Sequence, residues 1–470
     1  MNISESPEGA TLGRLAIAVG VLIALAFIVS IGITEIPVNY ALAAAAGAAL
    51  FTIVFLRTDL GLDILLLSML LSPEVILGGK GSIAEQREVS VRIDDFVILI
   101  VAFTWFAKAS VYKELGLVSK TPLNRPISAY MGACALTTAW GIAFGRVAVL
   151  SGLFYLLKYL EYFFVFYIVV NNVRTPAHAR RLIVVALVTA AIVSLTGIAQ
   201  IPSGERVSAP FEGPAGEPNT LGGYLVLMMA ITSGLTTEAK RTTFRLAGVG
   251  LVLLMLVPFA YTLSRASYLA LIPATLLLVS VSPKRALLVP TVIIGLLLIP
   301  YLAPKVVRER VQYTFKTQVG QPTVRFGQGG FDPSTSERLL SFNEAIAAWT
   351  ARPIFGYGIT GFRFMDAQYP RMLVETGVVG ALAFAWMIFA LFQLGVGRYR
   401  SATDPHWRGL TFIIIRVMEP FWFFTGLIVL LPELERVPAP TSEPGPPVRR
   451  ILPASPAATL RAGRFPRRVR

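Results

Sequence analysis

Residues 182–200 read LIVVALVTAAIVSLTGIAQ and contain no charged side chain. An apolar stretch of this length is what an α-helix needs to cross the hydrocarbon core of a bilayer. Similar stretches recur along the 470-residue chain, which is 55% hydrophobic and only 15% charged. A soluble domain carries about 25% charged residues. The sequence therefore predicts an all-α, polytopic transmembrane helical bundle.

We expect about 12–13 spans in a membrane domain over 1–432, followed by a basic Pro/Ala/Arg-rich tail over 433–470 that composition predicts to be disordered. The apolar stretches lie at about 15–33, 38–56, 61–78, 95–112, 127–144, 148–170, 182–200, 221–235, 246–262, 268–282, 286–302, 371–394 and 409–432. The last stretch contains Arg416, Glu419 and Pro420. It is therefore a re-entrant or broken helix, or two short helices, or the number of spans differs by one.

Basic residues concentrate in the loops between alternate spans, and the formal net charge is +15. These loops contain Lys108, Lys113, Lys120, Arg125, Arg174, Arg180, Arg181, Lys240, Arg241, Arg245, Lys284, Arg285, Arg398, Arg400 and Arg408. If the spans alternate, all of these loops lie on one face, which the positive-inside rule assigns to the cytoplasm together with the N-terminus. The same distribution argues against nucleic-acid binding. The linkers 79–93, 201–220 and 303–369 then lie on the opposite, outer face.

Residue counts argue against several kinds of chemistry. The chain has one cysteine, Cys134, and two histidines, His178 and His406, which lie far apart. We therefore expect no disulfide framework, no zinc or haem site and no cofactor. Magnesium held by carboxylates stays open. The first apolar run is too long for a signal peptide and more spans follow it.

The linker over about 303–369 is much longer than a turn between two spans requires. A loop of this size costs closure entropy and is more often functional than idle. It contains Ser336-Glu337-Arg338, an amphipathic run and Pro353-Ile-Phe-Gly356-Tyr-Gly358. The loop therefore predicts chemistry at the outer membrane surface.

Three arginines are expected at this outer face: Arg206, Arg265 and Arg338. A charge near the hydrocarbon needs a partner, and the planar guanidinium matches phosphate oxygens. If the arginines converge, they suit a diphosphate carried on a lipid. Alternatively, each extends to the interface or pairs with Asp or Glu. Arg265 is the strongest candidate, because almost no loop separates the two spans around it.

Other candidates follow the long loop. Asp366 is expected just before a helix that has Pro370 in its first turn, where its carboxylate can accept a proton from a hydroxyl or cap the helix. Glu375 lies deeper, and we favour a structural partner for it, such as an arginine. Lys158 and Glu161 are spaced to pair with each other on one helix face.

Further candidates are weaker. Asn219 is a plausible N-cap of the helix that follows it, in which Gly222 and Gly223 allow close packing. The aromatic residues of the long loop are suited to stacking on sugars or, as we favour, to burying the loop's own helix. They are Trp349, Phe355, Tyr357, Phe362, Phe364 and Tyr369.

Four stretches occur in a recognisable order. They are Arg206 with Phe211 and Pro218-Asn219-Thr-Leu-Gly, Leu263-Ser264-Arg265, Arg338 with Trp349, Pro353 and Gly356-Tyr-Gly358, and Asp366 to Gly380 with Tyr369, Leu373, Glu375 and Gly377. In this order and on one membrane face, they resemble the bacterial O-antigen ligase and polymerase family, which includes exopolysaccharide polymerases. Ligases of the family usually have His-Asn at Asp366-Ala367, and many polymerase-like members have Asp-Asn, so Asp366 favours a polymerase.

The resemblance implies a multi-pass protein of the bacterial inner membrane whose active face is extracytoplasmic. It implies metal-independent glycosyl transfer from an undecaprenyl-diphosphate-linked glycan to an acceptor glycan or lipid, alongside other polysaccharide assembly proteins. Arg265, Arg206 and Arg338 would stabilise the leaving diphosphate and Asp366 would orient or deprotonate the acceptor. The resemblance also implies substrate binding by Asn219, Tyr369 and Glu375.

Two other functions share these features. A polytopic transporter or lipid-linked glycan flippase would also have many spans and intramembrane charges, but it should show repeat symmetry and ionisable residues near the midplane. No repeat is evident in the sequence. A non-catalytic assembly component would use the long loop as a docking surface.

Overall fold

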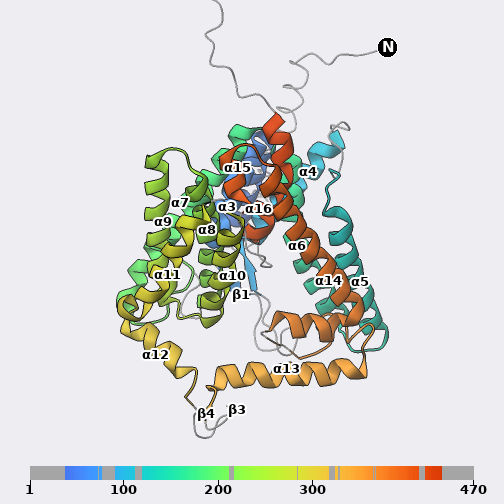
Figure 1. Cartoon of the computed structure of the whole chain (residues 1–470). Helices are drawn as coiled ribbons and strands as arrows, with labels where there is room; N and C mark the ends of the chain where they lie inside the picture. Colours follow the sequence, from blue (N-terminus) through green and yellow to red (C-terminus); the bar gives the residue numbers. More distant parts are fainter. Residues whose placement is uncertain are drawn as a thin grey trace, which may run out of the picture. The chain divides into compact units, whose positions relative to one another are not determined.

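A computed structural model describes residues 38–71, 74–76, 90–111, 119–210, 216–282, 284–316, 323–326, 329–363, 365, 367–411 and 419–436. Its helices are α2 (Val38–Leu56), α3 (Thr58–Leu71), α4 (Ile93–Val111), α5 (Asn124–Ala143), α6 (Val149–Asn172), α7 (Pro176–Gln200), α8 (Pro218–Glu238), α9 (Thr242–Tyr261), α10 (Arg265–Val281), α11 (Arg285–Leu302), α12 (Lys305–Tyr313), α13 (Pro333–Ala351), α14 (Gln368–Ser401), α15 (Pro405–Leu410) and α16 (Glu419–Arg436), with the short 3-10 turn η2 (Ile201–Ser203) (Figure 1). Two antiparallel strand pairs join β1 (Glu74–Ile76) to β2 (Ser90–Arg92) and β3 (Arg325–Phe326) to β4 (Gly329–Gly330).

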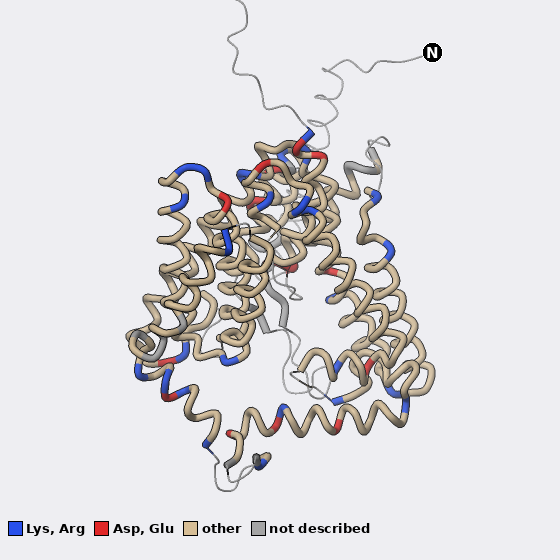
Figure 2. Tube along the Cα trace, viewed as in Figure 1, with Lys and Arg blue, Asp and Glu red and all other residues tan. Residues whose placement is uncertain are grey.

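The described helices have the length and composition of membrane spans. Five of them are long and apolar enough to cross a bilayer, namely Val149–Asn172, Pro176–Ser203, Pro218–Glu238, Thr242–Tyr261 and Gln368–Ser401. Three shorter apolar helices cover Ala45–Leu56, Arg265–Val281 and Arg285–Gly295. Figure 2 shows charged residues gathered mainly at the two ends of the helices, with largely uncharged stretches between them. The protein is an all-α polytopic membrane protein, as predicted.

The expected spans from 38–56 to 371–394 each overlap one helix. The expected span at 15–33 lies outside the described residues. Helix α3 ends at Leu71 rather than at 78, and α14 extends from Gln368 to Ser401. Helix α16 continues past the predicted domain boundary at 432, and the rest of the tail lies outside the described residues.

The predicted alternation of the loops is reflected in their contacts. At one end, Arg180 Nη2 lies 3.0 Å from Asp404 Oδ2 and Arg408 Nη1 lies 3.9 Å from Glu238 Oε2. At the other end, Arg265 reaches Asp332 of the long loop. The loops that the positive-inside rule groups together therefore meet one another.

The two described ends of the last apolar stretch lie together, which agrees with the re-entrant helix among the predicted alternatives. Glu435 Oε1 near the end of α16 accepts backbone N–H groups from Thr403 at 2.9 Å and Asp404 at 3.0 Å, just before α15. The chain therefore returns to the face from which it entered, the face of the basic loop at 398–408. This pairing removes the conflict between an odd number of spans and a basic tail.

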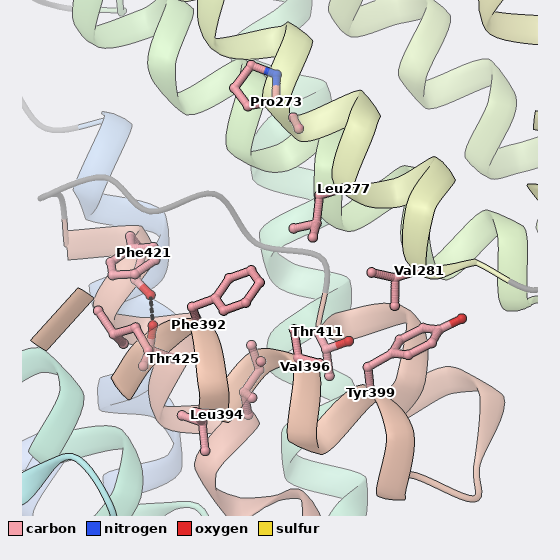
Figure 3. A pocket seen from close by; sticks show the side chains of 14 residues that line it. Pro273, Leu277, Val281, Phe392, Leu394, Val396, Tyr399, Thr411, Phe421 and Thr425 are labelled. Carbon is pink, nitrogen blue, oxygen red and sulfur yellow. Dashed lines mark hydrogen bonds between the residues drawn. The ribbon is translucent and has the colours of Figure 1, made fainter. Parts of the chain in front are cut away.

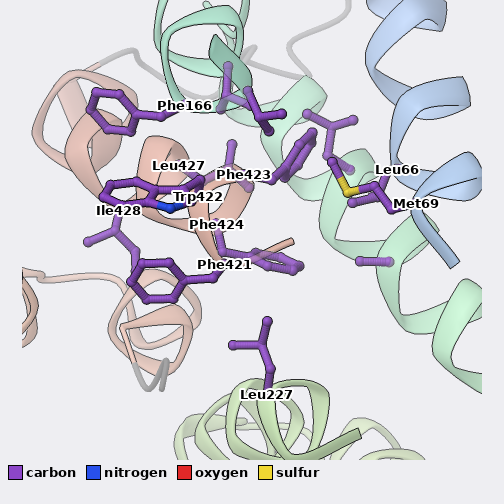
Figure 4. Close-up of a cluster of buried hydrophobic side chains, with 14 of the residues drawn as sticks. Leu66, Met69, Phe166, Leu227, Phe421, Trp422, Phe423, Phe424, Leu427 and Ile428 are labelled. Carbon is purple, nitrogen blue, oxygen red and sulfur yellow. The ribbon is translucent and has the colours of Figure 1, made fainter. Parts of the chain in front are cut away.

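An aromatic cluster anchors α16 inside the bundle. Its residues Phe421, Trp422, Phe423 and Phe424 are all at most 1% exposed (Figure 4). The Trp422 ring lies edge-on to Phe163 of α6, with 4.7 Å between the ring centroids. Between helices in a membrane, close packing of this kind supplies the stabilisation that the hydrophobic effect supplies in water.

Helix α14 is interrupted at Gly377, whose φ of 62° and ψ of −163° are not helical. The break frees backbone carbonyls, and the segment after α13 satisfies them. Tyr357 N–H donates to Val374 O at 3.0 Å and Gly358 N–H donates to Glu375 O at 2.8 Å. In return Val378 N–H donates to Pro353 O at 2.8 Å. Irregular backbone at membrane depth is tolerated where such partners exist.

We expect Gly377→Ala to destabilise the protein by about 1–3 kcal/mol, because this backbone conformation is open essentially only to glycine. A Cβ at position 377 would also collide with the carbonyl of Ile354. Thermal unfolding of the purified protein checks this. Gly397→Ala is the matched control in the same helix, because a Cβ there meets nothing within 4 Å. Equal stability of the two variants would contradict the role given to Gly377.

A second prediction concerns sidedness. With Cys134→Ala as background, single cysteines replacing the exposed residues Ser401 and Arg436 should react with a membrane-impermeant maleimide from the same side. A cysteine replacing Ser203 should react from the opposite side. Labelling of positions 401 and 436 from opposite sides would show that 409–432 crosses the membrane.

Candidate functional site

The turn between α9 and α10 has a strained backbone. Leu263 has a φ of +50°, a region that residues with a Cβ rarely adopt. Ser264 caps α10, since its hydroxyl accepts the N–H of Ser267. The Thr262 hydroxyl accepts the N–H of Ser264 at 3.3 Å. Strain of this kind persists only where the surroundings enforce it.

Arg206 and Asn219 both reach this turn from other segments. Arg206 Nε donates to Thr262 O at 3.0 Å and its Nη2 donates to Leu263 O at 3.4 Å. Asn219 Oδ1 accepts the Ser264 hydroxyl at 2.7 Å. The structure therefore brings together three of the predicted site residues, Arg206, Asn219 and Arg265, around one turn.

The predicted N-cap role of Asn219 is wrong. Helix α8 begins at Pro218 with Glu217 as its N-cap. Because proline fits the first helical position, the helix starts before Asn219, whose side chain is left to accept the Ser264 hydroxyl. The close packing predicted for Gly222 is confirmed, because a Cβ there would collide with Ser267.

Arg265 forms an ion pair with the long loop. Its Nη1 and Nη2 donate to Asp332 Oδ1 at 2.7 Å and Oδ2 at 3.0 Å, and Nη1 also donates to the Thr314 hydroxyl at 3.0 Å. The side chains are 17% and 2% exposed respectively. Of the two readings left open for Arg265, pairing with a carboxylate is the one observed. The same fork geometry is the one that a phosphate requires.

More arginines surround this pair. Burial lowers the pKa of the Arg206 guanidinium, and the positive charges of Arg310, Arg265 and Arg338 lower it further. The charges of the other three arginines therefore all act on Arg206. The described partners of Arg206 are neutral carbonyls, which leave its charge uncompensated by direct contact. We call Arg206, Arg265, Arg310 and Arg338 the arginine cluster; its charge favours an anion.

Sequence reasoning missed two members of this region, Asp332 and Arg310. Asp332 precedes Pro333, Ser334 and Thr335, a pattern typical of a helix start, and it is indeed the N-cap of α13. That signal could have located Asp332 but not its contact with Arg265, which is 67 residues away. Nothing in the sequence indicates that the charge of Arg310 in α12 acts on Arg206.

Glu375 has a structural partner inside the fold, although not one of the clustered arginines. It is 1% exposed, and its Oε1 accepts the N–H of Thr360 at 3.1 Å. Thr360 has a φ of +67°, so this bond holds a strained residue of the segment that fills the break in α14. The expected contact of Glu375 with substrate stays a prediction.

Asp366 lies outside the described residues. Its surroundings agree with the expectation, because α14 begins at Gln368 and Pro370 falls in its first turn. Tyr369 is 70% exposed. Arg371, one turn into the helix, donates to Gln368 Oε1 at 2.6 Å and to the Tyr159 hydroxyl of α6 at 3.4 Å.

A second charged group lies next to Tyr159 in α6. Lys158 Nζ lies 2.6 Å from Asp95 Oδ1 and 3.1 Å from Glu161 Oε2. The predicted pairing of Lys158 with Glu161 is confirmed, and Asp95 of α4 joins it. These charges compensate one another within the bundle, as intramembrane charges generally do.

Of the described loop aromatics, Tyr357 and Phe362 help to bury the loop's own helix, the role favoured for this group. Tyr357 and Phe362 pack around Ala345, Met365 and Val374. Because Ala345 belongs to α13 and Val374 to α14, this packing joins the two helices. Phe355 contacts Trp140 of α5 with 5.4 Å between the ring centroids. Phe364 lies outside the described residues.

An apolar cavity of about 370 Å³ lies between α10, α14, α15 and α16 (Figure 3). Leu277, Leu391, Phe392 and Ile428 are among its apolar lining residues, and Tyr399, Thr411 and Thr425 carry its hydroxyl groups. Its first lining residue on α10, Pro273, follows Arg265 by two helical turns, about 12 Å along the axis. The cavity suits a hydrocarbon chain.

The Asp332–Arg265 pair should make docking of the long loop sensitive to acid. Burial opposes ionisation of Asp332, but the Arg265 and Thr335 hydrogen bonds and the Arg265 charge outweigh it, so its pKa lies below the usual value. The pair therefore stabilises the fold above the unfolded pKa of about 3.9 and loses this effect as pH falls through the lower native pKa.

Replacing Asp332 by Asn should cost roughly 1.5–3 kcal/mol at pH 7, the usual contribution of hydrogen bonds to charged groups. Thermal stability of the wild type and of Asp332→Asn is compared in one detergent between pH 7 and pH 3. The difference should be constant down to about pH 5 and then shrink. A difference that is independent of pH would contradict the ionised pair.

Comparison with known proteins agrees with the resemblance seen in the sequence. A family model described as O-Antigen ligase matches residues 250–396, which include Arg265, Arg310, Arg338 and the start of α14 but neither Arg206 nor Asn219. No curated protein matches the chain. A domain of this kind indicates a role in ligation or polymerisation of O-antigen or a related polysaccharide. Over residues 250–396, less than a third of the chain, the protein is therefore similar to the O-antigen ligase family.

Proposed function

We propose that the protein transfers a glycan from a polyprenyl diphosphate to a hydroxyl of an acceptor glycan or lipid. In this proposal the reaction takes place at the outer face of the bacterial inner membrane. It extends or attaches O-antigen or exopolysaccharide chains. The observation that carries the proposal is that Arg206 and Arg265 meet at the α9–α10 turn, each held by hydrogen bonds, with the charges of Arg310 and Arg338 acting on Arg206.

The arginine cluster fits the leaving group of such a reaction. When the bond between the anomeric carbon and the diphosphate oxygen breaks, the electron pair stays on that oxygen and negative charge develops there. Guanidinium groups already held in place stabilise this charge without further reorganisation. Arg206 is held by two backbone carbonyls and Arg265 by Asp332, so both are oriented before a ligand arrives.

The acceptor side of the reaction is assigned to Asp366. The acceptor hydroxyl oxygen forms the new bond to the anomeric carbon, and its proton passes to the Asp366 carboxylate. Pro370 and Arg371 fix the helix start that follows Asp366, and Arg371 contacts Tyr159 of α6. Exposed Tyr369 offers an aromatic face to a sugar ring.

The hydrocarbon part of the donor is assigned to the apolar cavity. Arg265 opens α10, and Pro273, Ala274, Leu277 and Val281 of the same helix line the cavity. A diphosphate at Arg265 therefore places its isoprenoid chain along α10 toward the cavity. This arrangement separates a polar headgroup from an apolar tail, as a lipid carrier requires.

One observation favours the alternative of a transporter or lipid-linked glycan flippase. Lys158, Asp95 and Glu161 are ionisable residues within the bundle, where transporters carry coupling groups. Because these charges pair with each other, we give preference to the transferase. The two functions differ in outcome, since loss of a flippase leaves lipid-linked glycan in the inner leaflet.

The test is complementation of a strain that lacks this gene, scored by the length of surface and lipid-linked glycan. Asp366→Ala and Arg265→Ala should lose product at least 100-fold, because oxyanion-stabilising groups typically contribute this much to rate. Single repeat units on the carrier would indicate a polymerase, and full-length chains on the carrier a ligase. Wild-type product from either variant would contradict the proposal.

Two controls separate chemistry from folding. Arg265→Gln combined with Asp332→Asn replaces the buried ion pair by neutral groups that can still hydrogen-bond, and it should remain inactive although it inserts. Arg285→Ala changes an exposed arginine at the opposite end of the helices and should retain full activity. A strain in which even the wild type changes no glycan would favour transport or assembly.

A further inference from the structure

Helix α12 contributes Arg310 to the arginine cluster, although no motif of the sequence indicated this residue. It lies in the long loop and contacts α9. Just after it, Thr314 accepts a hydrogen bond from Arg265, and its backbone O accepts the Asp332 N–H at 2.9 Å. The end of α12 is therefore fixed at the Arg265–Asp332 pair.

The position of Arg310 on α12 follows from this anchor. Thr314 continues the helical conformation, with a φ of −56° and a ψ of −29°. Residues four apart lie on the same helix face, so Arg310 shares the face of Thr314 that meets Arg265. Arg308 is two residues from Arg310 and points about 200° away around the helix.

Arg310 has an unsatisfied donor, a state it shares with Arg371 and Arg398 among the described residues. Its Nε atom is buried and has no hydrogen-bond partner among the described residues. Its guanidinium lies over the ring of Tyr313, 5.8 Å from the centroid. A buried donor without an acceptor is costly, and such exceptions call for an explanation such as a missing ligand.

The charge of Arg310 also acts on Arg206. Among the charges that depress the pKa of Arg206, after its burial, Arg310 has the largest effect, ahead of Arg265 and Arg338. The positive charges of Arg206 and of Arg310 on α12 therefore oppose each other, although the two residues belong to different segments. An anion between them would remove the repulsion and supply the missing acceptor.

We propose that Arg310 is a binding residue for the diphosphate group, which it contacts together with Arg206. The identity of the donor in this inference rests on the proposed function. The chemical group that Arg310 would recognise is a pair of adjacent phosphates. Because α12 belongs to the long loop, Arg310 makes the complete anion site depend on the docked loop.

The test uses the purified full chain in nanodiscs, with inorganic pyrophosphate as the probe and its affinity measured by calorimetry. Arg310→Gln should weaken binding about 10- to 100-fold, the effect of losing one or more charge-assisted hydrogen bonds. Arg310→Lys keeps the charge without the fork and should be intermediate. Arg308→Gln is the matched control and should bind as the wild type does.

The outcomes separate this inference from the proposed function. Unchanged binding by Arg310→Gln, or no binding by the wild type, overturns the inference, whereas the glycan assay judges the transferase independently. The measurement is repeated with phosphatidylglycerol in the nanodisc. If that lipid abolishes the Arg310-dependent binding, Arg310 holds an ordinary lipid headgroup and the inference fails.

Discussion

The ion pair between Arg265 and Asp332 is the contact on which the arrangement of the segments around the α9–α10 turn depends. It joins the first residue of α10 to the N-cap of α13, and through Thr314 it also fixes the end of α12. Contacts of α12 with α9 and of α13 with α14 support the same arrangement. A pair with one partner 2% exposed is also expensive to break, since it leaves a buried charge. The long loop is therefore a docked part of the fold rather than a free connection.

The same pair places a carboxylate where a phosphate would bind. Asp332 uses both terminal nitrogens of Arg265, which is the geometry of bidentate phosphate recognition. The ion pair thus orients the Arg265 guanidinium and at the same time neutralises part of its charge. Arg206, whose described hydrogen bonds go to carbonyls, and Arg310, whose Nε lacks an acceptor, keep more of their capacity for an anion. The arginines of the cluster therefore differ in how much of their positive charge and hydrogen-bonding capacity is left for an anion.

Sequence patterns predicted the fold class and most spans because the bilayer imposes one length and one composition on every spanning helix. The alternation of basic loops predicted which linkers meet, and Arg180 with Asp404 and Arg206 with Leu263 bear this out. For the last apolar stretch the sequence left several alternatives open, because the Glu435 contacts that distinguish them involve backbone N–H groups about 30 residues away, a pairing no local pattern reports. Likewise the candidate arginines were identifiable by residue type, whereas Asp332 and Arg310 required the tertiary contacts of the long loop.

The break in α14 shows why the second half of the loop is ordered. Gly377 stops the helix inside the bundle, and the segment around Gly356 and Gly358 replaces the missing backbone hydrogen bonds. A Cβ at Gly356 would lie 2.5 Å from Val374 O, so the backbones approach as closely as glycine allows. This packing fixes the entry into α14, where Asp366 precedes the helix.

The proposed role of the arginine cluster is to bind the diphosphate of a lipid carrier. The decisive experiment is a structure of the protein in nanodiscs with a bound polyprenyl diphosphate. We expect phosphate oxygens within hydrogen-bonding distance of Arg206 and Arg310, with the isoprenoid chain following α10. A diphosphate bound elsewhere, with Arg206 still on the Thr262 and Leu263 carbonyls and no ligand at Arg310, would contradict it.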